Sequence, residues 1–188
     1  MKIKSILWAA ATAATLLGST YMSQAQTKEK TVMVGGAPMY PSKNIIENAV
    51  NSKDHTTLVA AVKAAGLVET LQGPGPFTVL APTNDAFAKV PKEALNNLMK
   101  PENRAQLTSI LTYHVIPGKW SAPQIVQAIK DGKGTYLTKS VQGGDLTFWM
   151  KGKDVYVKDA KGNSAKVTVA DVNQSNGVIH VIDAVLMP

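Results

Sequence analysis

Three histidines are the residues of this 188-residue chain best suited to bind a metal or to carry a proton. The sequence has no HExxH or HxH motif around them and no cluster of acidic residues at metal-ligand spacing. His180 lies between Val178 and Ile182 on one face of an expected strand, and His114 ends an expected helix. We therefore expect both to be hydrogen-bonded interior imidazoles, and we predict no metal site.

The sequence also leaves an enzymatic alternative open. His114 and His180 could meet across a cleft and serve a small-ligand or metal-dependent enzyme. That hypothesis requires a pocket in which both imidazoles are within reach of each other and have an open coordination position or a polar floor.

Nucleophilic and nucleotide chemistry have little support in the sequence. The chain has no cysteine, no GxSxG elbow, no GxGxxG motif and no P-loop. Thr83 follows an expected strand, but a threonine at a strand-to-helix turn is expected to cap the helix, whose first turn then carries Asn84 and Asp85. We predict no catalytic residue and no cofactor, and so a protein that is not an enzyme.

The basic residues suggest a second alternative, which is polyanion binding. The formal net charge is +7, and removal of Lys2 and Lys4 with a leader peptide would leave +5. A scattered excess of lysines is usually solvated surface, and no aromatic stacking ladder is evident beside it, so we predict no nucleic-acid role. The densest group lies on expected hairpins and consists of Lys151, Lys153, Lys158, Lys161 and Lys166.

The first 25 residues have the composition of a cleavable signal peptide. Lys2 and Lys4 precede an apolar run that is shorter than the roughly 20 residues of a membrane span. Residues 26–40 contain few apolar anchors and are expected to form a flexible lead-in, and residues 41–188 to form one domain. We expect an exported, periplasmic or extracellular protein without a membrane span.

The domain is expected to be α+β, because its pattern changes period along the chain. Its first two thirds have helical spacing of apolar residues, and its last third alternates apolar and polar residues as an antiparallel meander. The expected helical stretches are 45–50, 58–65, 95–99, 107–114 and, behind a capping box at Ser121 and Gln124, 125–129.

Three segments resemble the signature elements of the fasciclin domain family. They are FTVLAPTNDAF from Phe77 to Phe87, LTYHVIPG from Leu111 to Gly118, and NGVIHVIDAVLMP from Asn176 to Pro188. The resemblance implies a β-sandwich or wedge of mostly antiparallel strands with several helices packed along one side. The residues that it assigns to the structural signature are Thr83, Asn84, Asp85, Phe87, Asn176, Gly177 and His180.

The same resemblance implies adhesion or interaction and names residues that would contact a partner. These are Tyr113 and His114 with Leu111, Val115 and Ile116 beside them, and the pair Asp171 and Val172. Val172 stands where the family usually has isoleucine, and Ala170 where a basic residue often precedes the aspartate. The expected partner is a cell-surface or matrix protein or polysaccharide, bound by a monomer.

Overall fold

The computed structural model describes residues 29–188, so the signal peptide predicted for residues 1–25 lies outside the described residues. A seven-stranded sheet organises this part of the chain in the order β4-β3-β9-β8-β7-β6-β5, with β3 and β9 parallel and all other neighbours antiparallel. Its two edge strands, β4 and β5, contact each other, so the sheet approaches a closed barrel. The strands are β3 (Phe77–Pro82), β4 (Val115–Pro117), β5 (Thr135–Lys139), β6 (Asp145–Lys151), β7 (Asp154–Lys158), β8 (Ser164–Gln174) and β9 (Gly177–Ile182).

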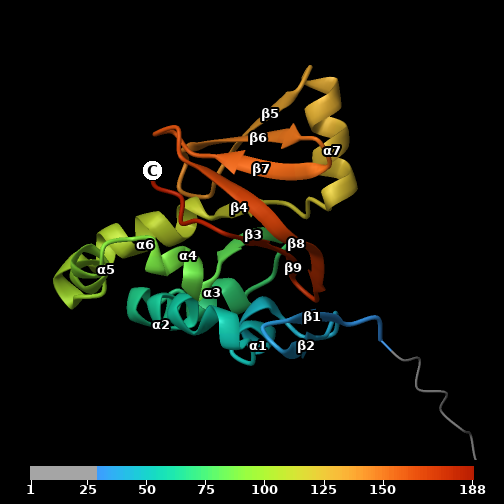
Figure 1. The fold of residues 1–188 in the computed structure, drawn as a ribbon. Helices are drawn as coiled ribbons and strands as arrows, with labels where there is room; N and C mark the ends of the chain where they lie inside the picture. The colour runs from blue at the N-terminus through green and yellow to red at the C-terminus, as the bar shows by residue number, and fades with distance from the viewer. Residues whose placement is uncertain (1–28) are drawn as a thin grey trace, which may run out of the picture.

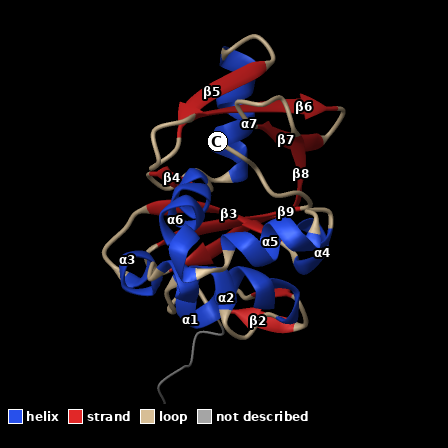
Figure 2. Ribbon diagram, turned by 90° about the vertical axis from the view of Figure 1, so that its left-hand side faces the viewer, coloured by secondary structure: helices blue, strands red, loops and turns tan. Residues whose placement is uncertain are grey.

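The helices lie in two places, as Figures 1 and 2 show. Six of them gather on one side of β3 and β9, and α7 lies apart beside β5 and β6. No helix within residues 29–188 is both long and apolar enough to cross a membrane. The helices are α1 (Ile45–Ala49), α2 (Thr56–Ala65), α3 (Val68–Gln72), α4 (Asn84–Ala88), α5 (Lys92–Leu98), α6 (Arg104–Tyr113) and α7 (Ala122–Asp131), with 3-10 turns at Lys53–His55 and Pro101–Asn103.

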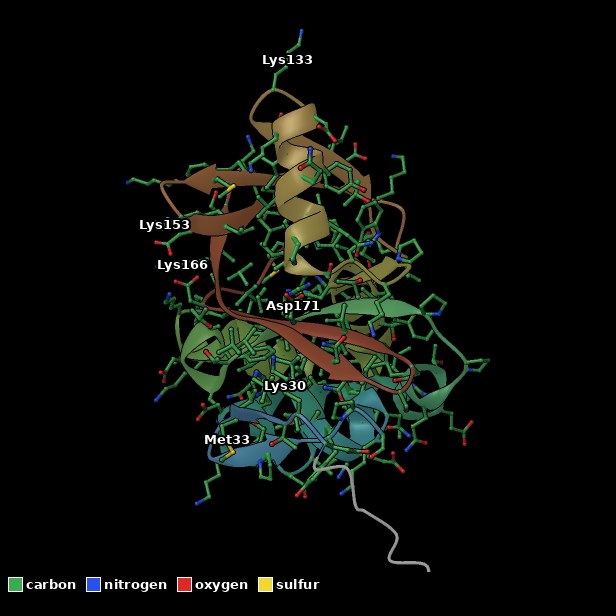
Figure 3. All side chains as sticks on the ribbon, turned by 90° about the vertical axis from the view of Figure 1, so that its right-hand side faces the viewer. Lys30, Met33, Lys133, Lys153, Lys166 and Asp171 are labelled. Carbon is green, nitrogen blue, oxygen red and sulfur yellow. The ribbon has the colours of Figure 1, made fainter. Side chains whose placement is uncertain are left out.

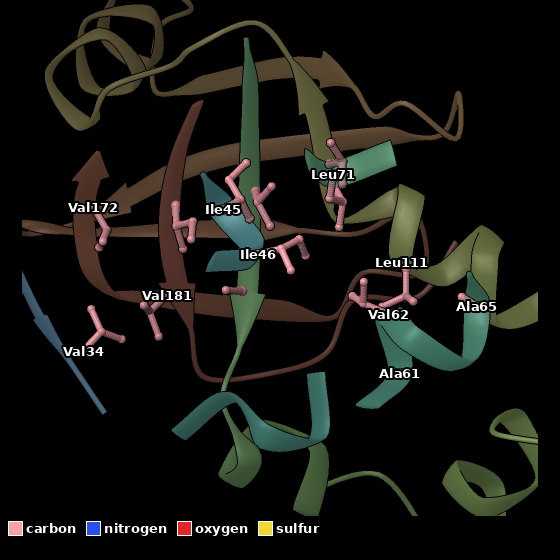
Figure 4. Packing of buried hydrophobic residues seen from close by; sticks show 14 of the residues in the cluster. Val34, Ile45, Ile46, Ala61, Val62, Ala65, Leu71, Leu111, Val172 and Val181 are labelled. Carbon is pink, nitrogen blue, oxygen red and sulfur yellow. The ribbon is translucent and has the colours of Figure 1, made fainter. Parts of the chain in front are cut away.

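The central strands are covered on both faces, which explains their nearly continuous apolar sequence. Val79 and Ala81 of β3 point into one hydrophobic cluster, here named the helical core, which is formed with α1, α2 and α6 (Figure 4). Leu80, between them, points into a second cluster, here named the α7 core, which also contains Ile125 and Ile129. The predicted α+β fold with a buried first signature strand is confirmed.

The lead-in predicted for residues 26–40 is wrong over its second half. Strands β1 (Val32–Val34) and β2 (Ala37–Met39) form an antiparallel hairpin, and Val34 and Met39 are buried in the helical core. Gly35 and Gly36 both have positive φ, 57° and 75°, and form its two-residue turn. Adjacent glycines here mark a tight turn, where we had expected flexibility.

Thr83 caps α4 as predicted. Its Oγ1 accepts a hydrogen bond from the Ala86 backbone N–H at 3.2 Å. We expect Thr83→Ala to lower the free energy of unfolding by about 1 kcal/mol, because the first turn loses its side-chain acceptor. Urea denaturation measures this, with Thr83→Ser as the matched control that keeps the hydroxyl. Equal stability of Thr83→Ala and the parent would show that the hydroxyl contributes nothing.

The two signature asparagines connect elements that are distant in sequence. Asn84, which we expected to serve its own helix, accepts from the Thr57 N–H at 3.0 Å and so caps α2. Asn176 accepts from the Ile45 N–H at 3.1 Å and donates to the Leu71 carbonyl at 2.8 Å. These residues therefore fix the helices onto the central strands, which supports the structural role that the resemblance implied.

Candidate partner-contact site

Tyr113 lies at the end of α6 and is fully buried in the α7 core. Its hydroxyl donates to the Asp145 carbonyl at 2.6 Å and accepts from the Ala160 N–H at 3.0 Å. Burial raises the pKa of the phenol, so it stays protonated. Tyr113 thus joins the end of α6 to the start of β6 and to the turn after β7.

His114 caps the same helix and uses both of its ring nitrogens. Nδ1 donates to the Ile110 carbonyl at 2.8 Å, and Nε2 accepts from the Leu186 N–H at 3.0 Å. Since the Leu186 bond requires an unprotonated Nε2, the ring must be neutral, and burial lowers its pKa to about 4.

The C-terminal segment is held by this histidine and by a buried carboxylate. Asp159 accepts from the Met187 N–H at 3.0 Å, and also from the backbone N–H groups of Lys161 and Asn163 in its own turn. Together with the His114 bond to Leu186, this places the last residues against α6 and the β7–β8 turn. His114 and Asp159 therefore hold the C-terminal segment in place.

Asp171 joins β8 to the start of α7. It has a φ of 58° and lies where the β8–β9 register shifts between Val169 and Val172, so it sits in an irregularity within a long strand. Its Oδ1 accepts from the Ala122 N–H at 2.7 Å, which satisfies one of the free donors in the first turn of α7.

His180 completes this junction from β9. Its Nδ1 accepts from the Asp171 N–H at 3.3 Å, and Nε2 donates to the Trp120 carbonyl at 2.7 Å. The Trp120 N–H in turn donates to Thr78 Oγ1 at 2.8 Å. Burial lowers the pKa of His180, so the neutral ring bridges β8 and the segment before α7.

The structure buries most of the predicted contact residues instead of gathering them on a surface. Leu111, Tyr113, His114, Val115, Ile116 and Val172 have exposed fractions between 0% and 6%. Their placement as direct partner contacts is therefore wrong in this fold, because their side chains fill the two cores. Asp171 differs from them because it is only partly buried.

Asp171 borders an open groove with a volume of about 410 Å³. The groove runs between the N-terminal hairpin, the first turn of α7 and the β8 irregularity, and Figure 3 shows Asp171 and Lys30 on the same side of the molecule. Its lining includes both charged and apolar side chains. We name it the Asp171 groove, and it is lined by Lys30, Val32, Met39, Ser121, Pro123, Ala170, Asp171 and Asn173.

The two histidines do not form the catalytic cleft of the alternative hypothesis. All four ring nitrogens of His114 and His180 bond to backbone groups, so neither ring offers a free lone pair to a metal or substrate. Among residues 29–188, no group of three or more His, Cys, Asp or Glu residues is placed to hold a metal ion.

The third histidine forms a pair with a serine. Ser52 Oγ lies 2.8 Å from His55 Nδ1, but both residues are buried, at 2% and 3% exposure. His55 Nε2 has no hydrogen-bond partner among the described residues, and His55 lines an apolar cavity. Burial lowers the pKa of His55, and the Ala81 backbone raises it by a smaller amount. Because no carboxylate of residues 29–188 orients the ring, the pair lacks the third member of a nucleophilic triad.

Comparisons with known proteins agree with this architecture. The Fasciclin domain family model matches residues 53–188. Protein sll1483 of Synechocystis is 47% identical over 167 residues, which cover 89% of this chain and 86% of that protein. Immunogenic protein MPB70 of Mycobacterium bovis is 36% identical over 145 residues, covering 74% of this chain and 66% of that protein.

Similarity extends to a solved structure and to a longer animal protein. The FAS1 domain pair of the insect cell adhesion molecule Fasciclin I has a TM-score of 0.69 at 16% identity, covering 86% of this chain and 59% of that one. Transforming growth factor-beta-induced protein ig-h3 of Sus scrofa is 36% identical over 149 residues, which are 79% of this chain but 20% of that protein. From the family match, the level of identity and the shared fold, we conclude that this chain belongs to the fasciclin domain family.

Proposed function

We propose that this protein is an exported interaction module that binds a protein partner outside the cytoplasm and catalyses no reaction. Its family includes a protein named as a cell adhesion molecule, which supports interaction as the general role. The engagement of the His114 and His180 nitrogens by backbone groups supports the non-enzymatic part of the proposal. The leader-like composition of residues 1–25 supports the exported part of the proposal.

The observation that carries the proposal is the position of Asp171 beside the groove. A carboxylate that is held rigidly by the Ala122 N–H can receive a partner's cation without a large loss of side-chain entropy. Lys30 contributes the opposite charge to the same groove. A peptide segment with a basic group, an apolar group and an acidic group would match this surface.

We expect Asp171→Asn to weaken partner binding at least about tenfold, which is about 1.4 kcal/mol. The amide keeps an oxygen that can accept from Ala122, and asparagine tolerates positive φ, so the variant removes the charge and keeps the fold. The partner is first isolated from extracellular material with the parent protein, and surface plasmon resonance then compares the variants.

Asp85→Asn is the matched control, because Asp85 is exposed in α4, away from the groove lining. It should bind as the parent does. Equal affinity of Asp171→Asn and the parent would remove the groove from the contact surface.

A further inference from the structure

The outer face of the meander carries an ordered row of side chains. In the sheet register Thr135, Trp149, Tyr156 and Lys166 lie directly opposite one another across β5, β6, β7 and β8. The adjacent register row points the other way and packs into the α7 core; it consists of Tyr136, Phe148, Val157 and Ala165. Because side chains alternate along strands, the Trp149 row must lie on the face away from α7.

Two aromatic rings form the centre of this outer row. The rings of Trp149 and Tyr156 are stacked, with centroids 4.8 Å apart and an angle of 22° between their planes. Both residues are partly exposed, and neither belongs to the helical core or the α7 core. A paired tryptophan and tyrosine outside the cores is typical of a contact surface, since such rings supply area at a low cost in conformational entropy.

Cations surround the aromatic pair. Lys166 lies opposite Tyr156 and pairs with Asp154 at 2.7 Å, while Lys158 lies two residues from Tyr156 on the same face. Figure 3 shows Lys153 and Lys166 on this part of the molecule. Four lysines of these hairpins have no carboxylate within ion-pair distance among residues 29–188: Lys151, Lys153, Lys158 and Lys161.

We infer that this outer face binds an acidic polysaccharide. The C–H face of a sugar ring packs against the Trp149–Tyr156 pair, and a carboxylate or sulfate group on the sugar meets Lys158, which has no carboxylate within ion-pair distance among residues 29–188. Asp154 and Thr147 add acceptors for sugar hydroxyls.

Nucleic acid is the competing polyanion for this surface. A single strand is typically held by successive aromatic rings that stack on successive bases, whereas this face of the described residues presents one stacked pair, Trp149 and Tyr156. The inference rests on the proposed role as an interaction module, but it uses a surface on a different part of the sheet from the Asp171 groove.

The test measures binding of the full exported chain to alginate and heparin by isothermal titration calorimetry, with neutral dextran and single-stranded oligo-dT as comparison probes. We expect binding to the acidic polysaccharides, none to dextran, and affinity that falls steeply with added salt. Trp149→Ala should weaken binding about tenfold or more, because the stacking surface is lost.

Charge variants keep the test decisive if Trp149→Ala folds poorly. Lys158→Gln, at an exposed position, should weaken binding severalfold and reduce its salt dependence. Lys92→Gln makes the same charge change on α5 and should bind as the parent does. Asp171→Asn should bind the acidic polysaccharides as tightly as the parent does.

Two results with the parent would overturn the inference: no binding to alginate or heparin, or tighter binding to oligo-dT than to these polysaccharides. Two results with variants would also overturn it: equal changes in polysaccharide affinity in Lys158→Gln and Lys92→Gln, or full polysaccharide affinity in a folded Trp149→Ala variant. None of these results removes the proposed protein interaction at the Asp171 groove, which is measured separately. Loss of polysaccharide binding in Asp171→Asn alone would move the sugar site to that groove.

Discussion

Replacement of Tyr113 by alanine is expected to lower the free energy of unfolding by about 3 to 5 kcal/mol. The side chain is fully buried in the α7 core, so its removal leaves a cavity beside α6 and the meander. It also leaves the Ala160 N–H without its acceptor. Urea denaturation followed by circular dichroism measures the loss.

Tyr113→Phe is the matched control for this prediction, because it keeps the ring and removes only the hydroxyl. It should cost about 1 to 3 kcal/mol, the penalty of leaving buried backbone groups unpaired. If Tyr113→Ala were as stable as the parent, the ring could not be part of the core. Because Tyr113→Ala is expected to lose so much stability, weaker partner binding by this variant would indicate unfolding and could not be assigned to a lost contact.

Acidification is expected to destabilise the protein between about pH 6.5 and pH 4. His114 has its pKa lowered by burial from 6.5 to about 4, so the unfolded chain takes up a proton at a pH where the folded chain does not. Stability from this residue is complete above pH 6.5 and is lost as the pH falls toward 4. The difference corresponds to about 3 kcal/mol for His114.

The other two histidines act in the same direction, because burial lowers the pKa of His55 and of His180 as well. Denaturant unfolding at several pH values measures the slope for the parent and for His114→Gln, which cannot titrate. His114→Gln is expected to be less stable than the parent at pH 7. Between pH 6.5 and 4, however, its free energy of unfolding should fall by about 3 kcal/mol less than that of the parent. Identical pH slopes in the two proteins would contradict a neutral, buried His114.

The sequence predicts the central strands and their helix cap because those signals are local. Phe77, Val79 and Leu80 are strand-forming apolar residues in a segment bounded by turn residues. Thr83 directly precedes the helix and can cap it. The hairpin at residues 32–39 is hard to predict because each of its strands has only three residues, and its two anchors, Val34 and Met39, acquire partners only in the folded helical core.

The sequence predicts an interior, hydrogen-bonded His114, and the structure confirms it, but the long-range partners of Tyr113 and His114 could not be predicted from their own segment. Their partners come from Asp145, Ala160 and Leu186, which are distant in the sequence and approach only when the meander and the chain end fold over α6. A motif match identifies residues that a family shares, but it does not indicate whether their side chains are buried or exposed.

The aromatic pair on the meander can be predicted when two sequence signals are taken together, the alternation of side chains along the strands and the position of the turn. Trp149 alternates with the inward-facing Phe148, and the Gly152–Lys153 turn sets the register that places Tyr156 opposite Trp149. Strand alternation and turn position together therefore predict a stacked pair among the lysines.

The most direct test of contact through exposed surfaces is hydrogen–deuterium exchange on the full chain, with and without its isolated extracellular protein partner. Partner binding is expected to slow exchange at residues 121–124 and 170–173, which form the rim of the Asp171 groove, and to leave residues 111–116 unchanged. Protection confined to residues 111–116, with no change at the groove, would contradict the proposed contact.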